Sequence, residues 1–129
     1  MYTYALEITK VYDGDTINGV VDLGFGICMD IKVRLADINT PELRTKDLDE
    51  KARGYAARDW LRDFLEKYSS GLQVRTTKKG KYGRWIGELL LPEDDYGYDE
   101  ELQKYDTTDG YYVINNILVI EGHAEKRTY

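Results

Sequence analysis

The hydrophobic pattern changes its period partway along the chain, and this change limits the possible folds more strongly than any other feature. In residues 27–36, Ile31, Val33 and Leu35 alternate with charged residues, which is the two-residue period of a half-buried β-strand. In residues 49–68, apolar side chains recur every three or four positions, as on one face of an amphipathic α-helix. The chain therefore combines sheet and helix.

Aromatic and β-branched runs bounded by turn residues predict four more strands. The full set is strands at residues 4–12, 16–23, 27–36, 72–77 and 84–91, and helices at residues 49–68 and 113–121. Gly54 lies inside the first helix at a cost of about 1 kcal/mol relative to Ala, which indicates a close contact or a bend. This element order is that of a five-stranded OB-type Greek-key barrel, α+β by content, whose open face commonly binds oligonucleotides.

Length and composition fit one domain over residues 1–129. The single cysteine, Cys28, excludes an intrachain disulfide and a thiolate metal cluster. The net charge of −6 argues against a general nucleic-acid coat protein but not against an enzyme with a locally basic site. The sequence shows no signal peptide and no membrane span, so we expect a soluble, cytoplasmic monomer without a membrane partner. A secreted protein that had lost its leader would look the same.

Residues 93–111 form a long polar stretch that carries most of the local acid. A connection of this length is uncommon, and we expect a solvated acidic insertion without regular structure. The alternative is a substrate gate whose tyrosines stack on bases. These tyrosines are Tyr96, Tyr98, Tyr105, Tyr111 and Tyr112.

Three short segments carry residue types suited to chemistry, and each also has an ordinary explanation. Residues 13–16, Asp-Gly-Asp-Thr, are typical of a hairpin turn. Residues 40–42, Thr-Pro-Glu, are typical of a helix start, with Thr as the N-cap. Residues 78–84 fit a solvated basic turn.

Taken together, the same residues supply the parts that phosphodiester hydrolysis needs. Asp15, Asn39 and the Thr40 carbonyl are hard oxygen ligands suited to Ca²⁺ or Mg²⁺. A divalent cation polarises the phosphoryl oxygen. Glu42 is a candidate general base for the attacking water.

Positive charge for the transition state is available from two arginines. Arg34 and Arg84 lie on different predicted strands, and each offers a planar set of donors for one phosphate. Further basic side chains at the fourth strand and the turn after it predict the phosphate-facing surface of an otherwise acidic chain. These are Arg75, Lys78, Lys79 and Lys81.

In four ordered segments the sequence resembles the staphylococcal nuclease (thermonuclease) family. The segments are residues 12–16, residues 34–35 with 39–42, residues 81–84, and residues 114–124. The resemblance implies a five-stranded OB barrel and Ca²⁺-dependent hydrolysis of DNA and RNA, preferring single-stranded or open regions. The cut would leave a 3′-phosphate. Other divalent cations, such as Mg²⁺ or Mn²⁺, stay possible.

The resemblance also implies a role for each matching residue. Asp15, Asn39 and the Thr40 carbonyl would hold the metal, and Glu42 would be the base or orient the water. Arg34 and Arg84 would bind the reacting phosphate and stabilise its transition state. The expected substrate contacts are Lys81 and Tyr82 from the resemblance, and Lys78 and Lys79 from the basic cluster.

Asn39 departs from the family pattern, because well-known members carry Asp there. One anionic ligand is lost, so we expect weaker metal binding. Asp37 would share a face with Asn39 on a regular strand and restore the charge, or it is an ordinary polar strand end. The alternative function is a catalytically weak or inactive OB-type module that binds single-stranded nucleic acid or a protein. A Ca²⁺-binding protein built on the acidic segment is disfavoured, because the segment lacks EF-hand ligand spacing.

Overall fold

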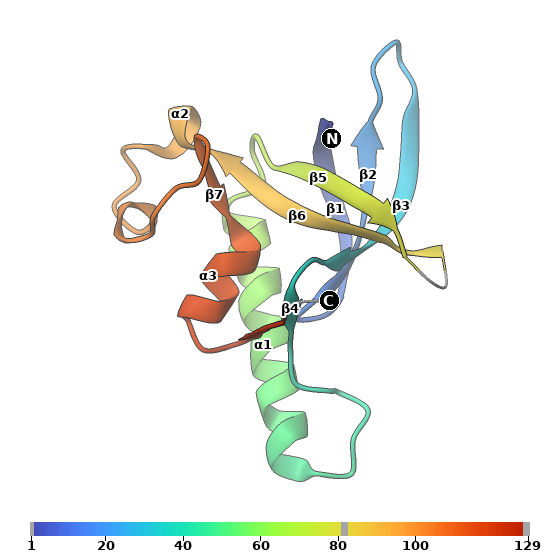
Figure 1. The fold of residues 1–129 in the computed structure, drawn as a ribbon, viewed down its shortest axis with the longest axis vertical. Helices are drawn as coiled ribbons and strands as arrows, with labels where there is room; N and C mark the ends of the chain where they lie inside the picture. Colours follow the sequence, from blue (N-terminus) through green and yellow to red (C-terminus); the bar gives the residue numbers. More distant parts are fainter. Residues whose placement is uncertain (1, 81–82, 128–129) are drawn as a thin grey trace.

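The computed structural model describes residues 2–80 and 83–127 (Figure 1). Within these residues, five strands close a barrel, which confirms the expected OB-type architecture. The five strands are β1 (Thr3–Asp13), β2 (Thr16–Asp22), β3 (Cys28–Leu35), β5 (Gln73–Lys79) and β6 (Trp85–Pro92). They follow the order β3-β2-β1-β5-β6, and a short parallel pairing between β3 and β6 closes the ring.

Alternation along β3 behaves as the sequence predicts. Ile31, Val33 and Leu35 are buried in the barrel, whereas Lys32 and Arg34 are only partly buried and face outward. Two short pairings are absent from the sequence prediction: β7 (Tyr111–Val113) extends the sheet beside β6, and β4 (Ile38–Asn39) pairs with β8 (Glu125–Lys126). The second pairing joins distant parts of the chain close to the expected metal ligands.

Helix α1 (Leu48–Lys67) begins after the N-cap Asp47, whose carboxylate accepts hydrogen bonds from two backbone N–H groups of the first turn. The predicted helix at residues 49–68 is confirmed, and the alternative start at residues 40–42 is wrong. A Cβ at Gly54 would lie 2.8 Å from the carbonyl oxygen of Pro41 and 2.9 Å from that of Glu42. The close contact expected at Gly54 therefore exists, and it fixes the backbone beside Glu42.

Residues 93–111 are largely exposed, as expected, but the expectation that they lack regular structure is wrong. This segment contains α2 (Glu93–Tyr96), a 3₁₀ turn η2 (Leu102–Lys104) and the start of β7, and it leads into α3 (Ile114–Ile120). Leu102, Tyr105 and Tyr112 are buried in the core. These apolar residues are scattered among acidic ones, so the sequence shows no periodic pattern that would predict their burial. Because Tyr105 and Tyr112 are buried, these two rings do not form the proposed base-stacking surface.

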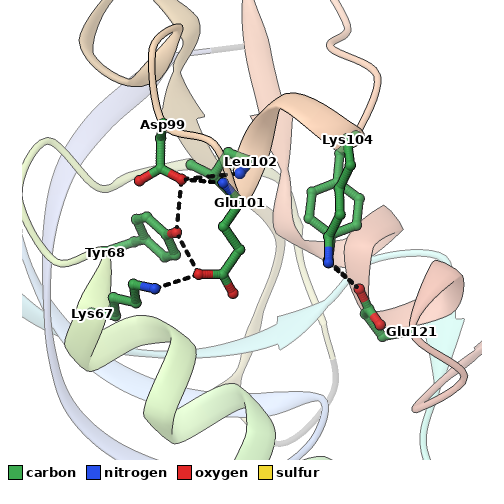
Figure 2. Close-up of polar contacts among 8 residues, drawn as sticks. Lys67, Tyr68, Asp99, Glu101, Leu102, Lys104 and Glu121 are labelled. Carbon is green, nitrogen blue, oxygen red and sulfur yellow. Dashed lines mark hydrogen bonds and ion pairs between the residues drawn. The ribbon is translucent and has the colours of Figure 1, made fainter.

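A polar cluster fastens the acidic segment to the end of α1 (Figure 2). The Tyr68 hydroxyl lies 3.0 Å from an Asp99 carboxylate oxygen and 3.1 Å from a Glu101 carboxylate oxygen. Asp99 also accepts the backbone N–H groups of Glu101 and Leu102, and Lys67 forms an ion pair with Glu101. Burial, together with the two carboxylates, raises the pKa of the Tyr68 hydroxyl, which therefore stays a donor.

In the part of the chain that the structure describes, no helix has the length and apolarity needed to cross a membrane.

Candidate functional site

The turn between β1 and β2 is packed tightly against the segment that follows β4. A Cβ at Gly14 would lie 2.8 Å from the Thr40 side chain and 2.9 Å from that of Ala57, so only glycine fits between them. The Asp13 carboxylate accepts the backbone N–H of Asp15 at 3.0 Å, which closes the turn. Sequence reasoning correctly identified a turn here, and the structure adds that the turn is a buried contact.

Asp15 is the centre of the hydrogen bonds in this region. Its side chain is largely buried, and the residue is 7% exposed. One carboxylate oxygen accepts the Thr40 backbone N–H at 3.1 Å, and the other accepts the Thr16 hydroxyl at 3.2 Å. The Asp15 carbonyl also accepts the Leu35 backbone N–H at 2.8 Å. These bonds tie the first turn to β3 and to the expected metal ligand Thr40.

The Arg34 guanidinium joins two of the expected metal ligands. One of its terminal nitrogens lies 3.3 Å from the Asp15 carboxylate and 3.3 Å from the Asn39 side-chain oxygen. The other terminal nitrogen donates to the Leu35 carbonyl at 2.9 Å. The structure thus brings Arg34, Asp15 and Asn39 together, with Thr40 bonded to Asp15.

Asp37 does not occupy the position that the sequence predicts for it. The strand is interrupted after Leu35, and Asp37 is exposed in a turn at φ 60°, a left-handed conformation. It therefore does not share a regular strand face with Asn39, so the geometric premise for its replacing the missing ligand charge is wrong. Asp37 lines the cavity that holds the arginines instead.

Arg34 and Arg84 line one surface cavity of about 810 Å³. Lys78 and Lys79 line the same cavity, as the sequence predicts for a phosphate-facing surface. The segment that supplies these residues is the end of β5 and the loop to β6, which the β3–β6 pairing holds beside Arg34. The other two expected substrate contacts, Lys81 and Tyr82, lie outside the described residues.

Glu42 faces a different cavity from the two arginines. It is exposed, and it lines a cavity of about 360 Å³ together with Asn39, Thr40, Arg53 and His123. Asn39 lines this cavity and also contacts Arg34, so it connects the expected base with one of the two arginines. The structure brings the expected metal ligands to Arg34, whereas Glu42 and the two arginines line separate cavities.

Asp13 is a second carboxylate of the site, to which sequence reasoning assigned no role. Burial raises its pKa to about 6, and the side-chain contact with Asp15 and the repulsion between the two carboxylates add to this effect, while the backbone N–H of Asp15 and the charge of Arg34 oppose it. The two-residue spacing of Asp13 and Asp15 around Gly14 was the sequence feature that could have indicated a second carboxylate at this site. Two carboxylates held this close are the arrangement that a cation stabilises.

The donor set fits a hard divalent cation. Carboxylate, amide and carbonyl oxygens are the ligands that Ca²⁺ and Mg²⁺ prefer, and Asp15, Asn39 and Thr40 supply one of each. Among residues 2–80 and 83–127, no group of three or more His, Cys, Asp or Glu side chains is arranged to hold a metal. A cation here would therefore depend partly on neutral oxygens, so the site is poor in negative charge.

The fold and the site define a small OB-type barrel protein with an oxygen-rich site at the start of β2 and an arginine-lined cavity beside it. A family model described as staphylococcal nuclease homologue matches residues 32–129. The chain belongs to the staphylococcal nuclease family. The match includes Arg34, Asn39, Glu42 and Arg84 and begins after Asp15, which the structure connects to Arg34. No curated protein matches the chain significantly.

Proposed function

We propose that this chain is a metal-dependent nuclease that hydrolyses phosphodiester bonds of DNA, RNA or both, and that it favours single-stranded substrate. Family membership supports the general class of activity. The observation that carries the specific proposal is the contact of Arg34 with both Asp15 and Asn39, at 3.3 Å in each case. A cationic donor for phosphate thus adjoins oxygen ligands for a cation.

The proposed division of roles follows from the position of each side chain. Asp15, Asn39 and the Thr40 carbonyl hold the cation, with Ca²⁺ the favoured ion and Mg²⁺ or Mn²⁺ as alternatives. When bound, the cation would draw electron density from the phosphoryl oxygens and stabilise their negative charge. Arg34 and Arg84 donate hydrogen bonds to the phosphate in their shared cavity and stabilise the added negative charge of the transition state.

Glu42 accepts the proton of the attacking water in this proposal. Its exposed carboxylate borders a cavity that has room for a water molecule. In this proposal it acts on the phosphate past Asn39 and Thr40, which line the same cavity as Glu42. The contact of Gly54 with the Glu42 carbonyl keeps this part of the backbone in place.

A second function is favoured by one specific observation. Glu42 and the arginines line separate cavities, and the neutral Asn39 leaves the metal site short of charge. An OB-type module that binds single-stranded nucleic acid, or a protein, with little or no cleavage would need Arg34, Arg84 and the lysines but no positioned base.

A cleavage assay separates the two functions. Purified protein is incubated with single-stranded DNA and, separately, RNA in Ca²⁺, Mg²⁺, Mn²⁺ or EDTA. Glu42→Gln and Arg84→Ala are the test variants, and Glu66→Gln and Arg62→Ala on exposed positions of α1 are the matched controls. Metal-dependent cleavage that only the test variants suppress supports the nuclease. Binding without cleavage in any metal supports the module.

A further inference from the structure

Tyr12 occupies an irregular position on β1, directly before the site turn. In the pairing of β1 with β2, Val11 lies opposite Ile17 and Asp13 lies opposite Thr16, so Tyr12 is the extra residue of a β-bulge. Bulges are frequent next to functional sites because they redirect a side chain. The bulge places an aromatic side chain one residue from Asp13.

Two lysines from separate strands converge on the Tyr12 ring. The Lys10 ammonium lies 4.5 Å from the ring centroid, and the Lys32 ammonium lies 4.4 Å from it. The two ammonium groups are therefore within about 9 Å of each other. Within the described residues, neither lysine forms an ion pair with a carboxylate. In a chain of net charge −6, two such lysines on one ring form a local positive site.

Asn18 lies between the two lysines on the sheet and hydrogen-bonds to an acidic residue of the same hairpin. It lies opposite Lys10 on β1 and opposite Lys32 on β3, so the three residues form one row. Its amide donates a hydrogen bond to the Asp30 carboxylate, which is thereby drawn to Asn18. Both lysines stay available to an external anion.

The site continues the proposed phosphate path. Lys32 precedes Arg34 by two residues on β3, so both side chains point to the outer face, separated by about 7 Å of strand. On β1, Tyr12 directly precedes Asp13. A single strand with one phosphate at Arg34 would be able to place its next nucleotide over this surface.

We propose that Lys10, Lys32 and Tyr12 form a binding subsite for the phosphate of the nucleotide next to the reacting one. The two ammonium groups bind the phosphate, and the Tyr12 ring positions them through cation–π contacts and packs against the nucleotide. The ligand class is a single-stranded polynucleotide at least two nucleotides long. This inference rests on the proposed function, because it takes Arg34 as the position of the first phosphate.

The test measures binding of fluorescent oligothymidylates, a dinucleotide and an octanucleotide, in EDTA by anisotropy. The variant Lys10→Met/Lys32→Met is compared with Lys67→Met/Lys104→Met, which changes the charge equally on the acidic-segment side, away from the β2–β3 hairpin (Figure 1). Tyr12→Leu removes the ring, and Tyr12→Phe retains it. Circular dichroism and thermal melting verify that each variant is folded.

We expect the Lys10→Met/Lys32→Met protein to bind the octanucleotide about fivefold more weakly at 0.1 M salt, and its salt slope to fall by about 0.7, as expected when one phosphate is no longer neutralised. Tyr12→Leu should weaken binding by a similar factor, and Tyr12→Phe and the Lys67→Met/Lys104→Met control should bind like the wild type. An unchanged salt slope in the Lys10→Met/Lys32→Met protein overturns the subsite.

Cleavage assays with the same proteins separate this inference from the proposed function. If the wild type cleaves and the Lys10→Met/Lys32→Met change leaves octanucleotide affinity intact, the subsite is wrong and the nuclease stands. If the wild type never cleaves but its binding depends on Lys10, Lys32 and the Tyr12 ring, the subsite stands and the nuclease is wrong. If the wild type neither binds nor cleaves, both are wrong.

Discussion

The Tyr68→Phe substitution tests whether the acidic segment is a fastened part of the fold. The change keeps the buried ring, which is 2% exposed, and removes only the hydroxyl near Asp99 and Glu101. A hydrogen bond to a charged group contributes about 1.5–3 kcal/mol. We take the lower end, about 1.5 kcal/mol, because Asp99 retains two backbone donors, Glu101 retains Lys67, and both carboxylates are solvated.

Thermal melting at neutral pH measures this loss. For 129 residues, an unfolding entropy of about 2.1 cal/mol/K per residue converts 1.5 kcal/mol into a Tm decrease of roughly 5 °C. Tyr98→Phe is the matched control, because Tyr98 is 95% exposed and its hydroxyl removal should change the free energy of unfolding by less than about 0.5 kcal/mol. A Tyr68→Phe protein with the same Tm as the wild type would refute the claim that the Tyr68 hydroxyl holds the acidic segment against α1.

The pH dependence supplies a second signature of the same contact. For Asp99, burial raises the pKa, but its two backbone donors and the Tyr68 hydroxyl outweigh this and lower it overall. For Glu101, the Lys67 contact and then the Tyr68 hydroxyl lower the pKa against burial. A lowered folded-state pKa gives stability above the unfolded-state value of about 4, which is lost as pH falls through the folded-state value. The difference in unfolding free energy between the wild type and the Tyr68→Phe protein should therefore become smaller below about pH 4.

Three further predictions concern the site. Asn39→Asp should tighten Ca²⁺ binding about tenfold in calorimetry, because it adds an anionic ligand, and unchanged affinity would exclude position 39 from the cation site. Gly54→Ala should lower the free energy of unfolding by about 1–3 kcal/mol in urea titration, because its Cβ would meet carbonyl oxygens at 2.8 and 2.9 Å; an unchanged midpoint would contradict that close approach. Lys78→Ala/Lys79→Ala should reduce the salt slope of single-strand binding by about 0.7 for each phosphate that these lysines neutralise, and an equal slope would remove them from the interface.

The barrel was predictable in part because the second half of β3 alternates between buried and partly exposed residues. Ile31, Val33 and Leu35 reveal their buried face without any tertiary information, and Gly54 indicates a close contact by its cost in a helix. The pairing of β4 with β8 was not predictable, because each strand has two residues and the partners are distant in sequence. The anchoring of residues 93–111 was hidden because Leu102 is isolated among acidic residues.

The candidate site was predictable in its residues but not in its geometry. Residue types and order identified Asp15, Arg34 and Asn39, which the structure joins by direct contacts. The left-handed turn at Asp37 interrupts the strand, so side-chain directions beyond it do not follow strand alternation. This is why the expected position of Asp37 is wrong and why the cavity of Glu42 was not foreseen.

The most direct test of the proposed activity is the chemistry of the product ends. A defined single-stranded DNA oligonucleotide is incubated with the protein and Ca²⁺, and the products are identified by mass spectrometry, with Glu42→Gln and Glu66→Gln proteins prepared in parallel. We expect fragments ending in a 3′-phosphate from the wild type and from Glu66→Gln, and at least about a hundredfold fewer from Glu42→Gln, as for loss of a general base. Intact oligonucleotide, or the same fragments in equal amount from Glu42→Gln, would contradict the nuclease assignment.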